Sequence, residues 1–284
     1  MICVLGDAHL DVVVRRLGPV ADDTDTPSQT VLGVGGQAAN VAAWVVALGG
    51  QSRLVYARGT DLAAGLVGDE LAGRGVQLAG PVVDGRTGVV VSLSDGGRSR
   101  SMLTDRGVGP QLAAGSLDES WLDGCTWLHL PAYSLVRDPV RAAARAAAAA
   151  AAKRSARLSI DLSSTAALVE FGVARFAGLL VALRPDLILG TEAEMALLET
   201  GLLQAGPPGG LPGLPGLGLG LAERVVKLGA AGVRVGGRIY PAEPADAVDS
   251  TGAGDAFAAG YLLGGVSLGL TAAARAVAII GGMP

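Results

Sequence analysis

DSTGAGDAF, residues 249–257, is the stretch of this sequence that says most about its fold. It follows a segment with strand character and precedes an apolar helical pattern, so we expect a helix to begin within it. Glycines at 252 and 254 let the backbone turn with several N–H groups exposed, and the dipole of the helix favours negative charge there. The stretch therefore predicts an anion-binding turn at the start of a helix.

Asp255 lies in the first turn of this predicted helix. The helix dipole should keep its carboxylate ionised and able to accept a proton from a hydroxyl group. Phosphoryl transfer needs charge stabilisation at fixed positions and a carboxylate that orients the nucleophile, and the turn with Asp255 provides both. The alternative interpretation of these nine residues is a glycine-rich turn with an ordinary first-turn aspartate.

A second glycine turn, GGQAAN, occupies residues 35–40 and also precedes a helical pattern. Its glycines would let a ligand approach the backbone, and the amide of Asn40 can both donate hydrogen bonds to a polyol and accept them from it. Taken alone, the segment is equally compatible with an ordinary loop-to-helix turn that has Asn40 on a polar face.

Apolar strand patterns alternate with helical patterns through the middle of the chain, which predicts a mainly parallel sheet with helices on both faces. Early strands at 12–16 and 30–32, and a hairpin within 87–104 that turns at Gly96-Gly97, do not fit this alternation. They predict a small second sheet, and residues 205–220 predict a Gly- and Pro-rich loop. We expect one domain, residues 1–284, with a three-layer α/β/α arrangement and a small β lid.

The two glycine turns, in this order and about 210 residues apart, resemble the two signatures of the ribokinase-like (PfkB) family of carbohydrate kinases. The similarity extends over nearly the whole chain. LGDAHLD at 5–11 resembles the opening strand of the family, and residues 87–103 resemble its substrate-side hairpin. SIDLS at 159–163 resembles a strand in the middle of its sheet, and VVKLGAAGV at 225–233 resembles its nucleotide-side segment.

The resemblance implies that the γ-phosphate of ATP is transferred to a hydroxyl, mostly a primary one, of a sugar or sugar-like molecule, with Mg²⁺ and in many members a monovalent cation such as K⁺. A nucleoside kinase of the same family is an alternative. The implied catalytic residues are the base Asp255 and the anion-binding Gly252, Ala253 and Gly254. The implied substrate-binding residues are Asp11, Gly35, Gly36 and Asn40. ATP would contact Lys227, Gly229, Gly232, Thr251, Gly252 and Gly254, with Mg²⁺ held through water by Glu192 and the monovalent cation by Asp249.

Three positions depart from the pattern of the family. Where many members have Asn-x-x-Glu, the matching stretch is residues 189–192 and begins with Leu189, so we expect altered handling of metal or phosphate. Gln37 stands where ribokinases proper carry lysine, so ribose is not implied. The sequence ends at Pro284, before the strand that walls off the adenine pocket in the family, so we expect nucleotide binding and the cation site to differ.

Two other functions were compared with the kinase interpretation. Residues 33–38 fit a dinucleotide-binding fingerprint, G-x-G-x-x-A, and Arg58 could hold a 2′-phosphate. That fingerprint normally lies in the first βα turn of the sheet, but here the first strand is at residues 2–6 and an irregular segment separates it from residues 33–38. An oxidoreductase would also give no role to the GAGD turn. A non-catalytic sugar- or nucleotide-binding protein on the kinase fold stays open; Leu189 favours it and Asp255 opposes it.

The remaining features limit the partners and the location. A net charge of −4 argues against nucleic acid, and Cys3 and Cys125 fit a reducing compartment, so we expect a cytoplasmic protein. The uncharged stretch 256–274 is nearly long enough to span a bilayer, but its glycines split it into two helical patterns, so we expect no membrane span. An open edge of the lid sheet would pair with a second subunit as a homodimer. The arginines at 98, 100 and 106 are interpreted as a solvated hairpin face, with contact between one of them and substrate or phosphate as the alternative.

Overall fold

The apolar runs of the chain form one nine-stranded sheet in the computed structural model, which describes residues 1–94, 100–205 and 222–284. Its strands are β1 (Ile2–Leu5), β4 (Ser52–Val55), β5 (Gln77–Ala79), β8 (Trp127–Pro131), β9 (Arg157–Asp161), β10 (Leu187–Thr191), β11 (Glu223–Lys227), β12 (Val233–Val235) and β13 (Arg238–Tyr240). Their order is β13-β12-β11-β10-β9-β8-β1-β4-β5. All pairs from β11 to β5 are parallel, and β12 and β13 join as antiparallel strands.

Helices cover both faces of this sheet, which is why its central strands are apolar throughout rather than alternating. One face packs against α1 (Gln37–Ala47), α2 (Leu62–Gly73) and α7 (Ala253–Val277). The other face packs against α3 (Val140–Lys153), α4 (Thr165–Phe171), α5 (Val173–Leu183) and α6 (Glu192–Ala205). The alanine run of α3 is largely buried, and its short side chains let this helix lie close to the strands.

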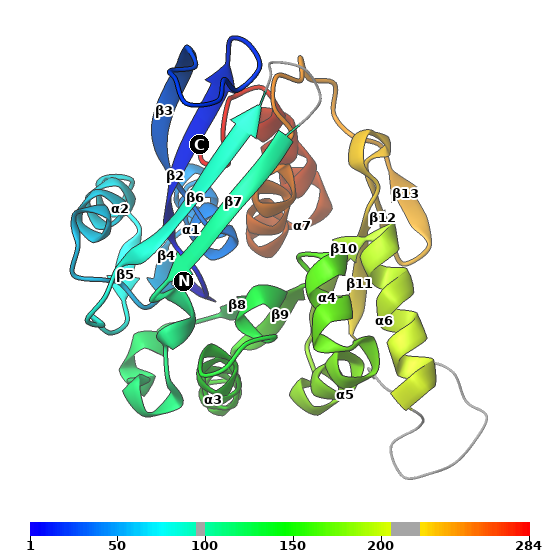
Figure 1. Ribbon diagram of the computed structural model, residues 1–284. Coiled ribbons are helices and arrows are strands. Elements are labelled where there is room, and N and C mark those ends of the chain that lie inside the picture. The colour runs from blue at the N-terminus through cyan, green and yellow to red at the C-terminus, as the bar shows by residue number, and fades with distance from the viewer. Residues whose placement is uncertain (95–99, 206–221) are drawn as a thin grey trace.

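A second, four-stranded sheet lies across one end of the first (Figure 1). It consists of β2 (His9–Arg16), β3 (Ser28–Gly35), β6 (Thr87–Ser94) and β7 (Arg100–Gly107), in the order β3-β2-β6-β7. The α/β fold class with a small additional sheet is thereby confirmed. The predicted turn at Gly96-Gly97, Arg98, and all but the first residue of the predicted loop 205–220 lie outside the described residues.

Helix α7 is, by length and composition, long and apolar enough to cross a membrane. Half of its most apolar window is buried inside the protein, where Phe257 and Leu262 belong to the core beside α1. Its backbone leaves the helical conformation at Gly264 and Gly265, the break that the glycines of this stretch predict. The pair α4 and α5 also passes the test together, but it is bent by 95°. We therefore interpret α7 as a core helix in two parts.

The parallel strands position the functional residues. In open parallel sheets, ligands bind where the strands end at their carboxyl side. Here β1 leads to Asp7, β9 ends at Asp161, β10 ends at Thr191 and β11 ends at Lys227. The start of α7 brings Asp255 to the same edge of the sheet, since electrostatic interactions connect Asp255 with Asp161, Lys227 and Asp7.

Candidate active site

The glycine turn at 252–254 forms the start of α7, as predicted. Gly252 has a φ of 74°, a left-handed conformation that glycine adopts without strain. A Cβ atom at this position would also lie 2.5 Å from Cα of Gly282, so the turn has no room for a larger residue. The amides of residues 253–255 lie in the first helical turn, where backbone N–H groups find no acceptor within the helix. The turn therefore presents donors for an anion.

Asp255 lies partly buried beside this turn, and Nδ2 of Asn40 donates a hydrogen bond of 2.8 Å to its Oδ2. Burial raises the pKa of Asp255 to about 7; the hydrogen bond from Asn40 opposes this rise, and the carboxylate of Asp161 adds to it. The sequence predicted a fully ionised carboxylate from the helix dipole alone, and burial outweighs that effect. A carboxyl group with a pKa near neutrality matches a general base that works near pH 7.

A buried ion pair lies next to Asp255. Nζ of Lys227 is 2.7 Å from Oδ2 of Asp161, whose side chain is only 1% exposed. Burial alone would lower the pKa of Lys227, but the carboxylates of Asp161, Asp255 and Glu194 raise it, so the ammonium keeps its charge. A Cβ atom on Gly254 would lie 3.3 Å from Nζ of Lys227. The structure thus brings Lys227, which the sequence assigns to the nucleotide side, to the anion-binding turn.

The four predicted substrate-binding residues lie at the junction of the second sheet and α1. Asp11 of β2 faces Gly35 of β3 so closely that a Cβ atom on Gly35 would be 2.2 Å from Oδ2 of Asp11. Gly36 has a φ of 108°, and a Cβ atom there would be 2.6 Å from the carbonyl oxygen of Asp7. The sequence explained these glycines by the approach of a ligand, whereas in the structure they let protein atoms approach one another. Asn40 follows one turn later in α1.

The other predicted nucleotide-side and cation-binding residues lie in two turns. Gly229 begins a 3₁₀ turn after β11, and Gly232 closes it at a φ of 98°, where a Cβ atom would meet the carbonyl oxygen of Tyr240. Oδ1 of Asp249 accepts hydrogen bonds from the amide of Thr251 at 2.9 Å and from its hydroxyl at 2.6 Å. Oδ2 of Asp249 accepts from the amide of Gly281 at 3.0 Å, so this carboxylate braces the turn before α7.

Glu192 is not brought to this cluster. Its side chain is 65% exposed, and its Oε1 lies 3.1 Å from Nη2 of Arg234. Glu194 is the buried carboxylate of this segment, at 6% exposure. Its Oε2 accepts from the amide of Thr191 at 2.7 Å, and its own amide donates to Oγ1 of Thr191 at 3.3 Å. This is a reciprocal capping box, and its Thr-x-x-Glu pattern is visible in the sequence.

A magnesium site built from protein ligands alone is not present in the part of the chain that the structure describes, where no three His, Cys, Asp or Glu side chains gather as a metal would require. Mg²⁺ usually keeps several waters and binds one or two carboxylates together with the phosphates of the substrate. Buried Glu194 and Asp161, both electrostatic neighbours of Lys227, fit that mode of binding.

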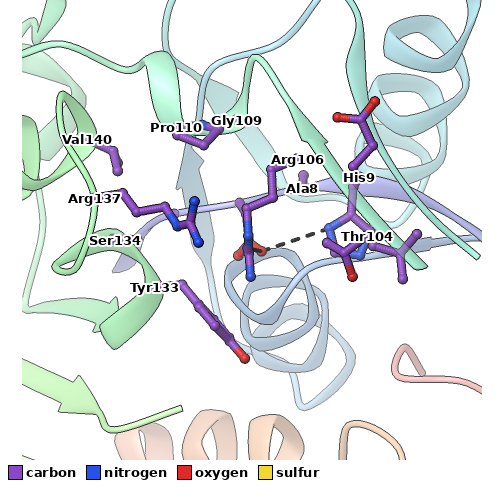
Figure 2. A pocket seen from close by; sticks show the side chains of 14 residues that line it. Ala8, His9, Thr104, Arg106, Gly109, Pro110, Tyr133, Ser134, Arg137 and Val140 are labelled. Carbon is purple, nitrogen blue, oxygen red and sulfur yellow. Dashed lines mark ion pairs between the residues drawn. The ribbon is translucent and has the colours of Figure 1, made fainter. Parts of the chain in front are cut away.

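A cavity adjoins this cluster on the side of the second sheet. It is lined by Asp7 after β1, by His9 of β2, by Arg106 of β7, and by Tyr133 and Arg137 after β8. Of these residues, the sequence indicated only Arg106, as one of three arginines that could contact substrate or phosphate. Figure 2 shows the side chains of Arg106 and Arg137 pointing into the same space above the ring of Tyr133. Nη1 of Arg106 is 3.7 Å from Oδ2 of Asp7, and its guanidinium lies 4.5 Å from the centre of the Tyr133 ring.

Comparisons with known proteins agree with this geometry. Residues 1–279 match the model of the family described as pfkB family carbohydrate kinase. The chain is 30% identical over 274 residues to the ATP-dependent ribose-1-phosphate kinase of Halopiger xanaduensis, covering 92% of this chain and 84% of that protein. Two solved structures share the fold at 21% identity: a putative ribokinase II from E. coli, with a TM-score of 0.82 over 99% of this chain and 94% of that one, and the adenosine kinase of Sinorhizobium meliloti, with a TM-score of 0.79 over 100% and 95%.

Proposed function

We propose, since the chain belongs to the pfkB family of carbohydrate kinases, that Asp255 is the base that takes a proton from a hydroxyl of a sugar or nucleoside as the γ-phosphate of ATP is transferred to that oxygen. The observation that carries this proposal is the position of Asp255 in the first turn of α7, beside the backbone amides of that turn and with a pKa of about 7. A proton acceptor and donors for the developing phosphoryl charge thereby occupy one turn.

Every predicted residue except Glu192 keeps its role in this proposal, including Asp249, which would hold a monovalent cation such as K⁺. Asp11, Gly35, Gly36 and Asn40 bind the acceptor at the junction of the second sheet and α1. ATP lies along Lys227, Gly229, Gly232 and Thr251, with its terminal phosphate at the amides of residues 252–254. Mg²⁺ bound with ATP neutralises charge on the phosphates. Glu194, together with Asp161, is the residue that would hold this ion through water.

The acceptor is a sugar or a nucleoside with a free hydroxyl, and a primary alcohol is the first choice. The relative from Halopiger xanaduensis is named for ribose 1-phosphate, which supports ribose and its derivatives as the first acceptors to assay. ADP release from Mg-ATP measured against these compounds, other sugars, sugar acids and nucleosides tests the reaction directly.

Asp255→Asn tests the role of the base. It should lower kcat by roughly 10²- to 10⁴-fold, the range expected for loss of a general base, while the far-UV circular dichroism stays unchanged. Asp246→Asn is the matched control, because Asp246 is exposed and lies outside the cluster. Near-normal turnover by Asp255→Asn would show that another group accepts the proton. Thermal stabilisation by ATP or a sugar without any turnover would favour a binding protein on the kinase fold.

Two further parts of the proposal concern assembly and location. Val31 and Leu32 of β3 and Met102 and Leu103 of β7 are each between 55% and 64% exposed, on the two edge strands of the second sheet. Open edges with exposed apolar side chains favour pairing with a second copy, so a homodimer is expected in sedimentation velocity, and a monomer at working concentration would contradict it. A cytoplasmic location is proposed because Cys3 and Cys125 are unpaired.

A further inference from the structure

Three arginines line one cleft beside the cavity of Figure 2. The cleft has a volume of about 420 Å³. We call it the arginine cleft and define it by Arg106, Arg137 and Arg175. The only carboxylate among its lining residues is that of Glu170. An excess of positive charge in a concave site indicates an anionic ligand.

Two of the three guanidinium groups are held by aromatic rings. Arg106 stacks on Tyr133 at 4.5 Å, and Arg175 stacks on Phe171 at 4.3 Å. Stacking occupies the face of a guanidinium and leaves the N–H groups on its edge free to donate. A site whose arginines are oriented before binding loses less side-chain entropy when a ligand arrives.

The third arginine has a weak partner. Nη2 of Arg137 lies 3.5 Å from Oε1 of Glu170, and these two side chains are 51% and 74% exposed. Exposed pairs of this kind contribute little to stability, so an incoming anion can replace the carboxylate of Glu170. Arg137 can then turn its donors to the same ligand as Arg106 and Arg175.

The arginine cleft is continuous with the candidate active site. Arg106 and Arg137 line both the cleft and the cavity that contains Asp7. Asp7 lies 3.7 Å from Arg106, and its carbonyl oxygen accepts a hydrogen bond of 3.2 Å from the amide of Ala39 in the first turn of α1. The carboxylate of Asp7 is also an electrostatic neighbour of Asp255. Asp7 therefore links the cavity beside the arginines to the surroundings of the base.

The donor nucleotide does not account for these arginines. The proposed ATP site lies along 227–232 and the turn at 251–254, and none of those residues lines the cleft or the adjoining cavity. The arginines come instead from β7, from the segment after β8 and from α5. Arg106 belongs to the second sheet, which also carries Asp11 and Gly35, and this shared sheet is what associates the arginine cleft with the acceptor residues.

We propose that the acceptor is a sugar monophosphate and that Arg106, Arg137 and Arg175 bind its existing phosphate group. This inference rests on the proposed kinase function and names its substrate class. A guanidinium offers five donors and no acceptor, so three arginines are poorly suited to neutral hydroxyls and well suited to the oxygens of a phosphate. A sugar carboxylate carries one negative charge, which one arginine can satisfy with two parallel hydrogen bonds. Three guanidinium groups match the larger charge of a phosphate monoester.

The test compares acceptors on the full-length chain with saturating Mg-ATP: ribose, ribose 1-phosphate, ribonate and adenosine. The highest kcat/KM is expected for ribose 1-phosphate. Arg137→Gln and Arg175→Gln should each raise its KM by about 10- to 100-fold with little change in kcat, since each removes charge-assisted hydrogen bonds from bound acceptor. Arg145→Gln is the matched control, because Arg145 is an exposed arginine of α3 outside the cleft, and it should leave KM unchanged.

Some outcomes would overturn the proposal while leaving the kinase function intact. Equal kcat/KM for ribose or adenosine, with no effect of the arginine substitutions, would exclude a bound phosphate on the acceptor. If ribonate gave the highest kcat/KM and Arg137→Gln raised its KM, the group bound by the arginines would be a carboxylate rather than a phosphate.

A binding measurement decides the question without turnover. The measurement compares two proteins: Asp255→Asn, in which the arginine cleft is unaltered, and Asp255→Asn that also carries Arg137→Gln and Arg175→Gln. Inorganic phosphate should raise the Tm of the first protein by several degrees more than it raises the Tm of the second. An equal rise in both proteins would locate the phosphate elsewhere, for example at the turn before α7, and would overturn the proposal. Because this readout needs no catalysis, failure of the kinase proposal and failure of the arginine proposal are distinguishable.

Discussion

Asn40 and Asp255 are 215 residues apart in the chain, yet Nδ2 of Asn40 donates a hydrogen bond of 2.8 Å to Oδ2 of Asp255. Asp255 lies in the first turn of α7 and Asn40 one turn after Gly36 in α1; each helix follows a glycine turn, and the two helices pack against each other. The two glycine turns that the sequence indicates separately therefore form one site. Oδ1 of Asn40 is buried and has no hydrogen-bond partner among the described residues.

Asn40→Leu should move the pH dependence of the reaction. The hydrogen bond from Asn40 lowers the pKa of Asp255 against the effect of burial, so its loss should raise that pKa above about 7. A base works only when ionised, so kcat/KM falls as the pH drops through its pKa. The acid limb of kcat/KM should shift upwards by about one pH unit, which corresponds to a charge-assisted hydrogen bond of modest strength. If the acid limb of kcat/KM stayed at the same pH, the ionisation of Asp255 would not be what determines it.

Asp255→Asn should stabilise the fold at high pH. The folded protein holds the proton of Asp255 up to a pKa of about 7, whereas the ordinary value is 3.8. The contribution of this group to stability is therefore greatest below about pH 4 and is lost as the pH rises through 7. The shift corresponds to at most about 4 kcal/mol. Asparagine has no proton to lose, so the Tm of the variant should match wild type at pH 4 and exceed it at pH 8.

The measurement is thermal unfolding of both proteins across this pH range, with Asp246→Asn as the control. The exposed Asp246 should give the same difference from wild type at every pH. If the Tm difference between Asp255→Asn and wild type were also the same at every pH, burial would not disfavour the ionised form of Asp255. The pKa of this group would then not be raised towards 7, which contradicts the proposed base.

Local signals explain why the fold class and the turns could be predicted. Alternating strand and helix patterns, and glycines before helical stretches, depend on residues close together in the sequence. Gly252 and Asp255 were placed correctly at the start of a helix for this reason. The raised pKa of Asp255 has no local signal, because it depends on burial and on the charge of residues such as Asp161 that only the order of the strands brings near.

Long-range placement explains what was missed. Arg137 and Arg175 have the pattern of ordinary surface charges, and only the packing of α5 beside the segment after β8 brings them to one cleft. Matching Asn-x-x-Glu to residues 189–192 assigns the metal to Glu192, but a shift of two residues along a helix points the side chain of Glu194 in a different direction. The Thr-x-x-Glu pattern at 191–194 marks the helix start and would have identified the buried carboxylate.

Glu194→Gln and Glu192→Gln form a matched pair that tests the metal assignment. Glutamine can still complete a capping box, so Glu194→Gln removes the buried charge and keeps the start of α6. The Mg²⁺ concentration for half-maximal activity should rise by roughly 10- to 100-fold in this variant, as for other residues that orient a metal or its waters. Glu192→Gln should leave it unchanged, because Glu192 is exposed and paired with Arg234. The reverse result would return the role to Glu192.

The buried pair of Lys227 and Asp161 should be strongly coupled. Lys227→Met leaves the carboxylate of Asp161, 1% exposed, without its partner at 2.7 Å, and removal of one member of such a pair costs about 3–5 kcal/mol. Asp161→Asn leaves the ammonium unpaired and should cost a similar amount. The double substitution leaves neither member of this pair as an unpaired charge, so its cost in urea unfolding should be well below the sum of the two single costs.

Lys153→Met is the control for this cycle, since Lys153 is the only other lysine of the chain. Its ion pair with Glu119 is exposed, so the free energy of unfolding should stay nearly unchanged. Lys227→Met should also raise the pKa of Asp255, because the Lys227 ammonium lowers it, and the acid limb of kcat/KM should move to higher pH. If the free-energy costs of the two single substitutions added up to that of the double substitution, and the acid limb of kcat/KM did not move, Lys227 would act neither on Asp161 nor on the base. A strong coupling with a shifted limb would make the ammonium a positioning group for both.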